Sequence, residues 1–324
     1  MNAQLAPDLG APLRVLFIDD EARITRALKV LFRDYEVYTC NDPREAPRLA
    51  RDHDVDVVVC DQRMPEMTGT ECLAEIRQLA PRAMRLLLTG FSDLKAVLGS
   101  VNEGEVFRFV NKPWDNRELR ELVATAGAIA REAPAMPIEP ISAAEHEEAR
   151  NAVGVLVIED DPQVQQRLRE ILQPYYQVRF AASADRAMQI LEQHETGVVI
   201  SETEVEHGDL TGMLKTLKQY HPHIATVVCT ERANAQTAID LINDGQVYRM
   251  LIKPVRMGSC RLSVDAAIGR YWQLKKTPAA VRRFTVVRSA NDGAVPVRVN
   301  ESLLARIRQL PSRLVSIARF TTIF

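Results

Sequence analysis

The sequence contains no long apolar run and few cysteines. None of its apolar stretches approaches the roughly 18 residues needed to cross a bilayer, and the first residues, MNAQLAPDLGAP, lack the basic-then-apolar order of a signal peptide. The five cysteines are odd in number and irregularly spaced, and no two of them form a C-x-x-C pair. We therefore expect reduced cysteines in the core of a cytoplasmic protein, with no membrane contact.

The net charge is small as well, at −2, so the charge of the whole chain indicates no class of partner. The charges are nevertheless uneven, because residues 275–324 carry ten Lys or Arg residues against only Asp292 and Glu301. These basic residues are scattered and accompanied by few aromatics, which makes nucleic-acid binding the less favoured interpretation. We expect this tail to pack on its own protein or on a partner. DNA binding through the tail, as in a transcriptional regulator, is kept as an alternative function. The tail could also be an incomplete domain that passes a signal on.

Apolar runs alternate with segments of helical periodicity in the first part of the chain. Helical patterns lie at residues 24–31 and near residues 42–52, 70–79, 92–102 and 115–130, and four of the expected strands appear as the apolar runs Leu13–Ile18, Val55–Cys60, Arg85–Leu88 and Val106–Val110. Continuous apolar runs are typical of parallel strands that helices cover on both faces. After an N-terminal extension at 1–12, residues 13–131 therefore predict an α/β domain of five strands and five helices.

The alternation stops at residues 132–152 and then restarts. Pro134, Pro137 and Pro140 argue against a regular helix in this stretch, and its polar remainder predicts an exposed linker. The pattern resumes at Val153–Ile158 and continues to a final helix at Met257–Leu274. We therefore predict a second domain at 153–274.

The second domain repeats the first. An offset of 141 positions separates three matched pairs, and one inserted residue makes the offset 140 for a fourth; the pairs are Asp61 and Glu202, Thr89 and Thr230, Lys112 and Lys253, and Asp20 and Asp160. Several matched landmarks at one spacing indicate a tandem repeat.

Polar residues follow the predicted strands of the first domain. Asp19 and Asp20 follow the first strand, Asp61 the third, Thr89 the fourth and Lys112 the fifth. The carboxyl ends of parallel strands meet at one edge of the sheet, where functional groups gather. Three converging carboxylates repel one another unless a cation lies among them, and their hard oxygens suit Mg²⁺. With the hydroxyl and the ammonium, the set predicts a site that stabilises a phosphoryl group on a carboxylate.

The order FIDDE…VVVCDQRMPEMTG…LLLTG…FRFVNKPW resembles the receiver domain of two-component response regulators over about residues 13–131. The resemblance implies a flavodoxin-like (βα)5 fold with a doubly wound, parallel five-stranded sheet. It also implies that Asp61 accepts a phosphoryl group from a sensor histidine kinase or a phosphotransfer protein, without turnover chemistry beyond self-phosphorylation and self-dephosphorylation. The output would pass to a downstream protein, or into a homodimer, through the face formed by helix four, strand five and helix five.

The same resemblance assigns a role to each matched position. Lys112–Pro113 would be a cis peptide bond, and Phe109 matches the switch aromatic of the family. Thr89 and Lys112 would contact the phosphoryl oxygens. Mg²⁺ would be held by Asp19, Asp20, Asp61 and the backbone carbonyl of Arg63.

A phosphatase of the haloacid-dehalogenase type also uses an aspartate nucleophile that follows a strand. That chemistry needs a second carboxylate two residues after the nucleophile as general acid and base, and here this position is Arg63. The sequence therefore favours the receiver over the phosphatase.

The site of the second domain is altered. It comprises Glu159, Asp160, Glu202, Thr230 and Lys253, with Met250 in place of the aromatic. Phosphoryl transfer depends on sub-ångström positioning, so the extra methylene of the glutamate at the acceptor position predicts a steep loss of acceptor function. Glu202 could instead reach toward Lys253 and Thr230. The domain is then either a pseudo-receiver that provides a docking or dimerisation surface, or a weak metal- and pH-dependent switch.

The tail carries two local patterns. Arg283–Arg288 is compatible with a short strand. Asn300 is a candidate cap for a helix that ends before Pro311 and carries Leu303, Leu304, Ile307 and Leu310 on one face.

Overall fold

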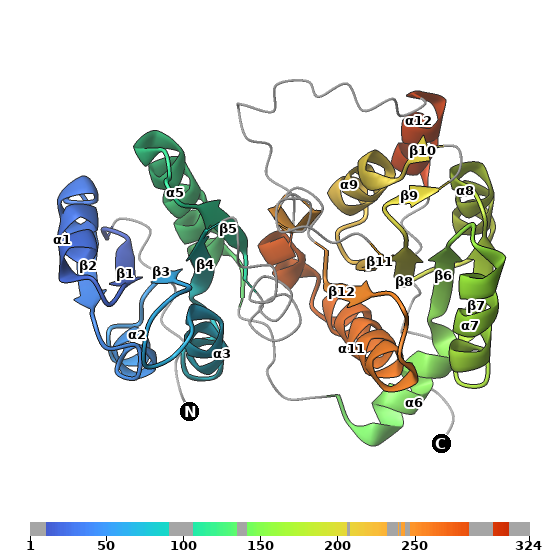
Figure 1. Ribbon diagram of the computed structural model, residues 1–324, viewed down its shortest axis with the longest axis horizontal. Helices are drawn as coiled ribbons and strands as arrows, with labels where there is room; N and C mark the ends of the chain where they lie inside the picture. Colours follow the sequence, from blue (N-terminus) through green and yellow to red (C-terminus); the bar gives the residue numbers. More distant parts are fainter. Residues whose placement is uncertain are drawn as a thin grey trace, which may run out of the picture.

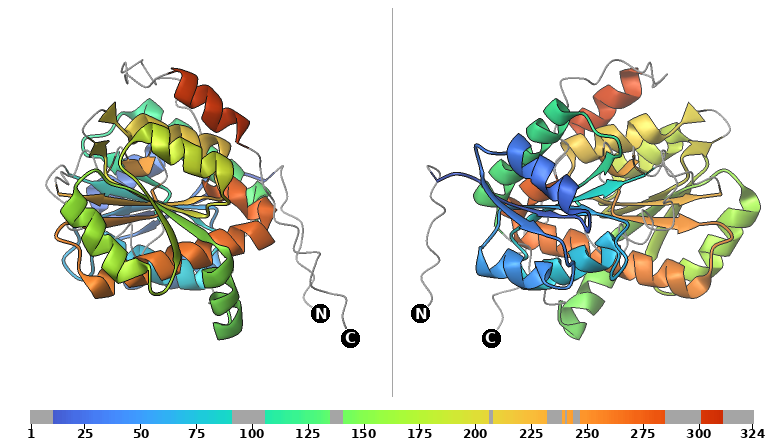
Figure 2. Two further views of the ribbon diagram at one scale, coloured as in Figure 1. Left: turned by 90° about the vertical axis from the view of Figure 1, so that its right-hand side faces the viewer. Right: turned by 60° about the vertical axis from the view of Figure 1, so that its left-hand side comes forward.

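Two parallel sheets with helices on both faces organise the chain (Figures 1 and 2). The structure is a computed structural model and describes residues 11–90, 106–134, 141–205, 208–231, 239, 241–243, 247–284 and 301–310. Within these ranges, no helix is both long and apolar enough to cross a membrane.

The first sheet has the strand order β2-β1-β3-β4-β5, and all its strands run parallel. Its elements are β1 (Arg14–Ile18), α1 (Ala22–Leu31), β2 (Glu36–Cys40), α2 (Ala46–Asp52), β3 (Val57–Asp61), α3 (Gly69–Leu79), β4 (Met84–Thr89), β5 (Arg108–Asn111) and α5 (Asn116–Glu132). Successive strand side chains point to opposite faces. In β1, Val15 and Phe17 pack in one core with α1 and α5, while Leu16 and Ile18 pack in another with α2 and α3.

The second sheet repeats this arrangement with the order β12-β11-β8-β6-β7, again all parallel. Its elements are β6 (Gly154–Ile158), α7 (Pro162–Leu172), β7 (Gln177–Ala181), α8 (Ala184–Gln193), β8 (Val198–Ser201), α9 (Thr211–Tyr220), β11 (Ala225–Thr230), β12 (Arg249–Ile252) and α11 (Met257–Lys276). A two-residue antiparallel pair, β9 (Glu204–Val205) with β10 (Gly208–Asp209), has no counterpart among the described elements of the first domain. The predicted fold of two parallel five-stranded sheets is confirmed, whereas the predicted helix at 92–102 lies outside the described residues.

The linker prediction was wrong in its second half. Residues Ala143–Ala152 form helix α6, which begins with a capping box between Ser142 and Glu145. Ala149 is fully buried against α11, and Arg150 Nε lies 2.9 Å from Asp265 Oδ1. The three prolines all precede Ser142, so they leave the capped segment after them able to form a helix.

The described residues 301–310 of the tail pack on the second domain. Helix α12 (Glu301–Gln309) is confirmed, and its buried Leu303 and Ile307 join the core on the α8 and α9 side. The Ile307 carbonyl lies 2.9 Å from His221 Nε2, and Arg306 Nε lies 2.7 Å from Glu192 Oε1. The expected strand was wrong at its start, because 3-10 helix η1 (Pro278–Phe284) includes Arg283 and Phe284; residues 285–288 lie outside the described ranges.

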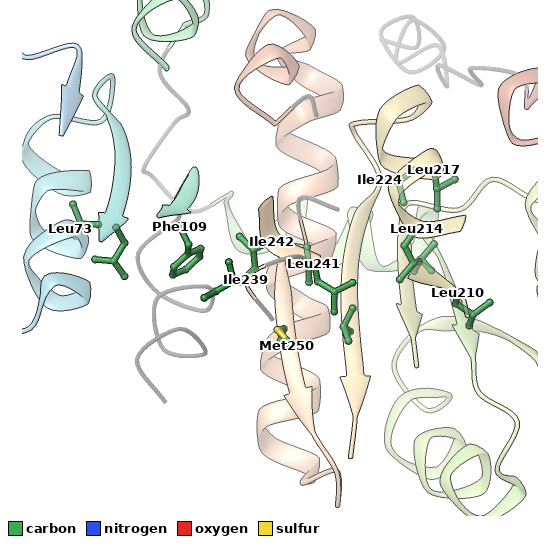
Figure 3. Packing of buried hydrophobic residues seen from close by; sticks show 14 of the residues in the cluster. Leu73, Phe109, Leu210, Leu214, Leu217, Ile224, Ile239, Leu241, Ile242 and Met250 are labelled. Carbon is green, nitrogen blue, oxygen red and sulfur yellow. The ribbon is translucent and has the colours of Figure 1, made fainter. Parts of the chain in front are cut away.

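The two domains contact each other at the β5 edge of the first. Phe109 of β5 lies beside Ile239 and Ile242, helical residues between β11 and β12 of the second domain (Figure 3). A cavity of about 60 Å³ between the domains is lined by residues that include Arg85 of the first domain, Lys218 and Arg270 of the second, and Arg283 of the tail. The face through which a homodimer was expected is therefore occupied, at least at this edge, by the second domain of the same chain.

Candidate functional site

The polar residues of the first domain meet at the carboxyl edge of its sheet. Asp61 is the last residue of β3 and Thr89 the last residue of β4. Asp19 follows β1, and Lys112 follows β5. The Lys112 backbone N–H donates to the Thr89 carbonyl over 2.8 Å, which holds these two strand ends together.

Three carboxylates form a compact cluster there. Asp19, Asp20 and Asp61 each offer a carboxylate oxygen within 4.8 Å of the others. Asp19 and Asp61 are buried, whereas Asp20 is exposed. Burial raises the pKa of Asp19, and the neighbouring Asp61 charge adds to that rise against the lowering contacts of the Glu21 N–H and Lys112. This concentration of negative charge favours a hard cation among the oxygens.

Lys112 partly compensates this charge. Its Nζ lies 2.7 Å from Asp61 Oδ1 and 3.4 Å from Asp19 Oδ2. Burial alone would lower the pKa of Lys112, but the hydrogen bond and charge of Asp61, with help from Asp19, raise it overall. Asp61 Oδ1 also accepts the Gln62 backbone N–H over 2.8 Å, so the orientation of this carboxylate is fixed from two sides. About a third of the Lys112 side chain is exposed, so the site is open to water on this side.

The space beside Asp61 is large enough for a small ligand. A cavity of about 510 Å³ is lined by Asp20, Gln62, Arg63, Met64, Pro65 and Thr68. Directly after Thr68, helix α3 begins so close to β3 that a Cβ on Gly69 would lie 2.1 Å from the Asp61 carbonyl oxygen. Glycine therefore lets the helix start abut the acceptor strand.

Three further residues were singled out in this domain. Thr89 is buried, and its Oγ1 donates to the Gly90 carbonyl over 3.3 Å. The Lys112–Pro113 bond is cis, as the family resemblance implied, and so is Lys253–Pro254. Phe109 is buried in β5 and lies at the contact between the domains.

The corresponding site of the second domain is closed by its own side chains. Lys253 Nζ lies 2.6 Å from Glu159 Oε2 and 2.7 Å from Glu202 Oε2, and only 8% of the lysine side chain is exposed. Burial alone would lower the pKa of Lys253, but the two glutamates raise it well above its usual value. The other oxygen of Glu202 accepts the backbone N–H of Thr203 over 2.8 Å and its hydroxyl over 3.0 Å.

The expected reach of Glu202 toward Lys253 is thus present in the structure. Thr230 ends β11, and its carbonyl accepts the Lys253 N–H over 3.0 Å. Glu159 was predicted to belong to this site, but its contact with Lys253 was not predicted; like Glu202, it is one methylene longer than its counterpart in the first domain, Asp19. Across the part of the chain that the structure describes, only the Asp19 cluster brings together three potential metal-ligating acids; Asp160 forms no such group with the two glutamates.

A family model described as the response regulator receiver domain matches residues 15–124 and again residues 155–265. The two matches cover more than half of the chain and coincide with the two sheets.

Curated relatives match over one domain's length. The hydrogenase transcriptional regulatory protein HoxA of Cupriavidus necator is 36% identical over 113 residues, which is 35% of this chain and 23% of that protein. The regulatory protein AtoC of Escherichia coli is 35% identical over 115 residues, or 35% of this chain and 25% of that protein. The chain thus spans about a quarter of the length of these relatives. Among solved structures, the signal receiver domain of an HD domain-containing protein from Pseudomonas fluorescens is 32% identical, with a TM-score of 0.36, covering 38% of this chain and 93% of that one.

Proposed function

Because the chain belongs to the response regulator receiver domain family and carries two such domains in tandem, we propose that it is a response regulator whose first domain accepts a phosphoryl group on Asp61. The observation that carries this proposal is the placement of Asp61: it is the last residue of β3, its carboxylate contacts Lys112 Nζ at 2.7 Å, and its neighbours Asp20 and Gln62 line an open cavity.

The proposed chemistry is an in-line transfer from a phosphohistidine of a sensor kinase or phosphotransfer protein. An Asp61 carboxylate oxygen forms the new O–P bond while the N–P bond of the donor breaks, and the electron pair of that bond returns to the imidazole. Lys112 and Thr89 would donate to the oxygens of the transferred group. Charge-assisted donors held in place before the reaction stabilise the negative charge of the transition state.

The residues present fit Mg²⁺. Three carboxylate oxygens lie within 4.8 Å of one another, and burial, together with the charge of Asp61, raises the pKa of the Asp19 carboxyl. Asp19, Asp20, Asp61 and the backbone carbonyl of Arg63 would hold the ion. When bound, Mg²⁺ neutralises charge on the carboxylates and on the phosphoryl oxygens.

The second domain is proposed to be a pseudo-receiver. Its lysine is bound by Glu159 and Glu202, and both oxygens of Glu202 have partners. An incoming phosphoryl group would have to displace a buried, doubly paired ammonium, and the alternative of a weak switch is therefore less well supported.

A DNA-binding regulator remains the alternative, and the similarity to the hydrogenase transcriptional regulatory protein HoxA favours it. The part of the tail that the structure describes supports it less. Helix α12 buries Leu303 and Ile307 against the second domain, and Arg306 is paired with Glu192. Salt-sensitive DNA binding that disappears on deletion of residues 275–324 would favour the alternative.

The proposed function is tested with acetyl phosphate and Mg²⁺, followed by intact mass measurement. Wild type should gain one phosphoryl group and Asp61→Ala none. Glu202→Ala is the matched control and should still gain one group. Wild type that gains none would overturn the proposal, and a group remaining on Asp61→Ala would overturn the assignment of the second domain as inert.

A further inference from the structure

The outermost strand of the first sheet is held by a side chain of the second domain. The Phe109 backbone N–H donates to Asn243 Oδ1 over 2.8 Å, and Asn243 Nδ2 donates to the Phe109 carbonyl over 2.9 Å. Strand β5 has β4 on one side only. The carboxamide therefore fills the open side at Phe109 in the way that one residue of a neighbouring strand would.

Apolar packing accompanies these hydrogen bonds. The Phe109 side chain is 3% exposed and lies against Ile239 and Ile242 of the second domain (Figure 3). Paired hydrogen bonds fix the register of the contact, while burial of the aromatic ring supplies most of its stability.

Residues of the tail make further contacts with the first domain, beyond the edge of the sheet. In η1, Arg283 Nη2 donates to the carbonyls of Arg82 over 2.8 Å and Pro81 over 3.2 Å. Arg282 Nη1 lies 2.6 Å from Glu132 Oε2. The second domain thus holds the first at the β5 edge, and the tail segment η1 contacts it just before β4 and at the end of α5, so the docked arrangement is specific.

The held strand leads directly into the candidate phosphoryl site. Phe109 lies three residues before Lys112, whose Nζ contacts Asp61 Oδ1 at 2.7 Å. A phosphoryl group on Asp61 would add about two negative charges and three acceptor oxygens at this contact. Lys112 would then have to move to new partners, and its backbone is continuous with the strand that Asn243 fixes. We expect no corresponding movement of Lys253 in the second domain, because this lysine already contacts both Glu159 and Glu202.

We propose that the second domain is the built-in partner of the β5 edge of the first domain, and that this docking opposes occupancy of the Asp61 site by a phosphoryl group. The proposal rests on the proposed function of Asp61. The two directional hydrogen bonds of Asn243 require the Phe109 backbone to stay where it is, while Lys112, three residues further on, contacts the Asp61 carboxylate that would carry the phosphoryl group. Thermodynamic linkage makes the two equilibria affect each other equally. A variant that lowers the docking equilibrium constant should therefore raise the affinity of the Asp61 site for a phosphoryl mimic by the same factor, until the domains no longer dock.

The test uses the full-length protein, with beryllofluoride and Mg²⁺ as a non-covalent phosphoryl mimic. Its affinity is measured by isothermal titration calorimetry, and the separation of the domains by small-angle X-ray scattering. Asn243→Ala removes both hydrogen bonds and should weaken docking about tenfold or more. Asn243→Asp keeps the acceptor but loses the donor, and serves as a second variant if the first folds poorly. Asn151→Ala, exposed in α6, is the matched control.

We expect beryllofluoride to expand wild type and to bind Asn243→Ala up to about tenfold more tightly, with Asn151→Ala like wild type. Equal affinities in wild type and both Asn243 variants would overturn the coupling while leaving Asp61 as the acceptor. Unchanged scattering of the unliganded variants, compared with wild type, would overturn the role of Asn243 in docking. If wild type neither binds beryllofluoride nor is phosphorylated by acetyl phosphate, the proposed function itself fails, and the coupling with it.

Discussion

Replacing Lys253 by methionine should destabilise the second domain strongly and in a pH-dependent way. The change leaves Glu159 and Glu202 facing each other without the cation that lies 2.6 and 2.7 Å from their oxygens. Removing one member of a buried ionic group costs about 3–5 kcal/mol. Part of this cost is offset, because the lysine no longer has to be buried and a carboxylate can take up a proton. We therefore expect a loss of about 3 kcal/mol near pH 8.

The sign of the pH dependence follows from the carboxylates. Burial already raises the pKa of Glu159 in the presence of Lys253. Without the ammonium, the folded-state pKa rises further above the unfolded value, so the folded state binds more protons. The variant should approach wild-type stability below about pH 4 and lose stability as the pH rises through the raised carboxylate pKa values.

The assay is urea unfolding followed by tryptophan fluorescence. The chain has two tryptophans, Trp114 in the first domain and Trp272 in the second, so a Trp114→Phe background reports on the second domain alone. The matched variant is Lys112→Met, measured in a Trp272→Phe background. Lys112 is about a third exposed, and its loss should cost about 1 kcal/mol or less. A loss below about 1 kcal/mol for Lys253→Met at pH 8, or a loss that is the same at pH 5 and pH 8, would refute the reasoning.

Three further outcomes are expected. Burial, with the charge of Arg270, lowers the pKa of Lys218 to about 7, so the unfolded state binds more protons than the folded state between about pH 7 and 10. Wild-type stability should therefore rise with pH across that window, and the rise should vanish in Lys218→Met. Chemical unfolding measured at a series of pH values checks both. Ile307→Ala should destabilise the second domain by about 2–4 kcal/mol, because this side chain is fully buried, whereas a change at exposed Arg308 should leave the melting temperature unaltered. Asp20→Asn should weaken Mg²⁺ binding about tenfold or more in calorimetry, since it removes a charged oxygen from the cluster; unchanged affinity would place the ion elsewhere.

The strand ends that carry the first site could be located from the sequence because a polar residue ends or follows each of these apolar runs. Asp61, Thr89 and Lys112 lie at one edge of the sheet, as their positions after strands predicted. Their convergence follows from the parallel topology alone, which is why so much of the first site could be predicted from the sequence.

Other features depend on contacts that no local pattern records. Helix α6 was missed because three prolines dominated the interpretation of the linker, although Ser142 and Glu145 supply a capping box. The hydrogen bonds between Asn243 and Phe109 join residues 134 positions apart. A lone asparagine after a helical pattern is typical of a helix end, so its partner could be identified only from the folded chain.

The covered edge of β5 also bears on how molecules of this protein meet one another. An edge strand with free N–H and C=O groups is a template on which a strand of another chain can pair. While Asn243 occupies these groups at Phe109, a second molecule has no access to them. Opening of the two domains would therefore uncover a pairing site, and the same asparagine that ties the domains together keeps the closed molecules apart.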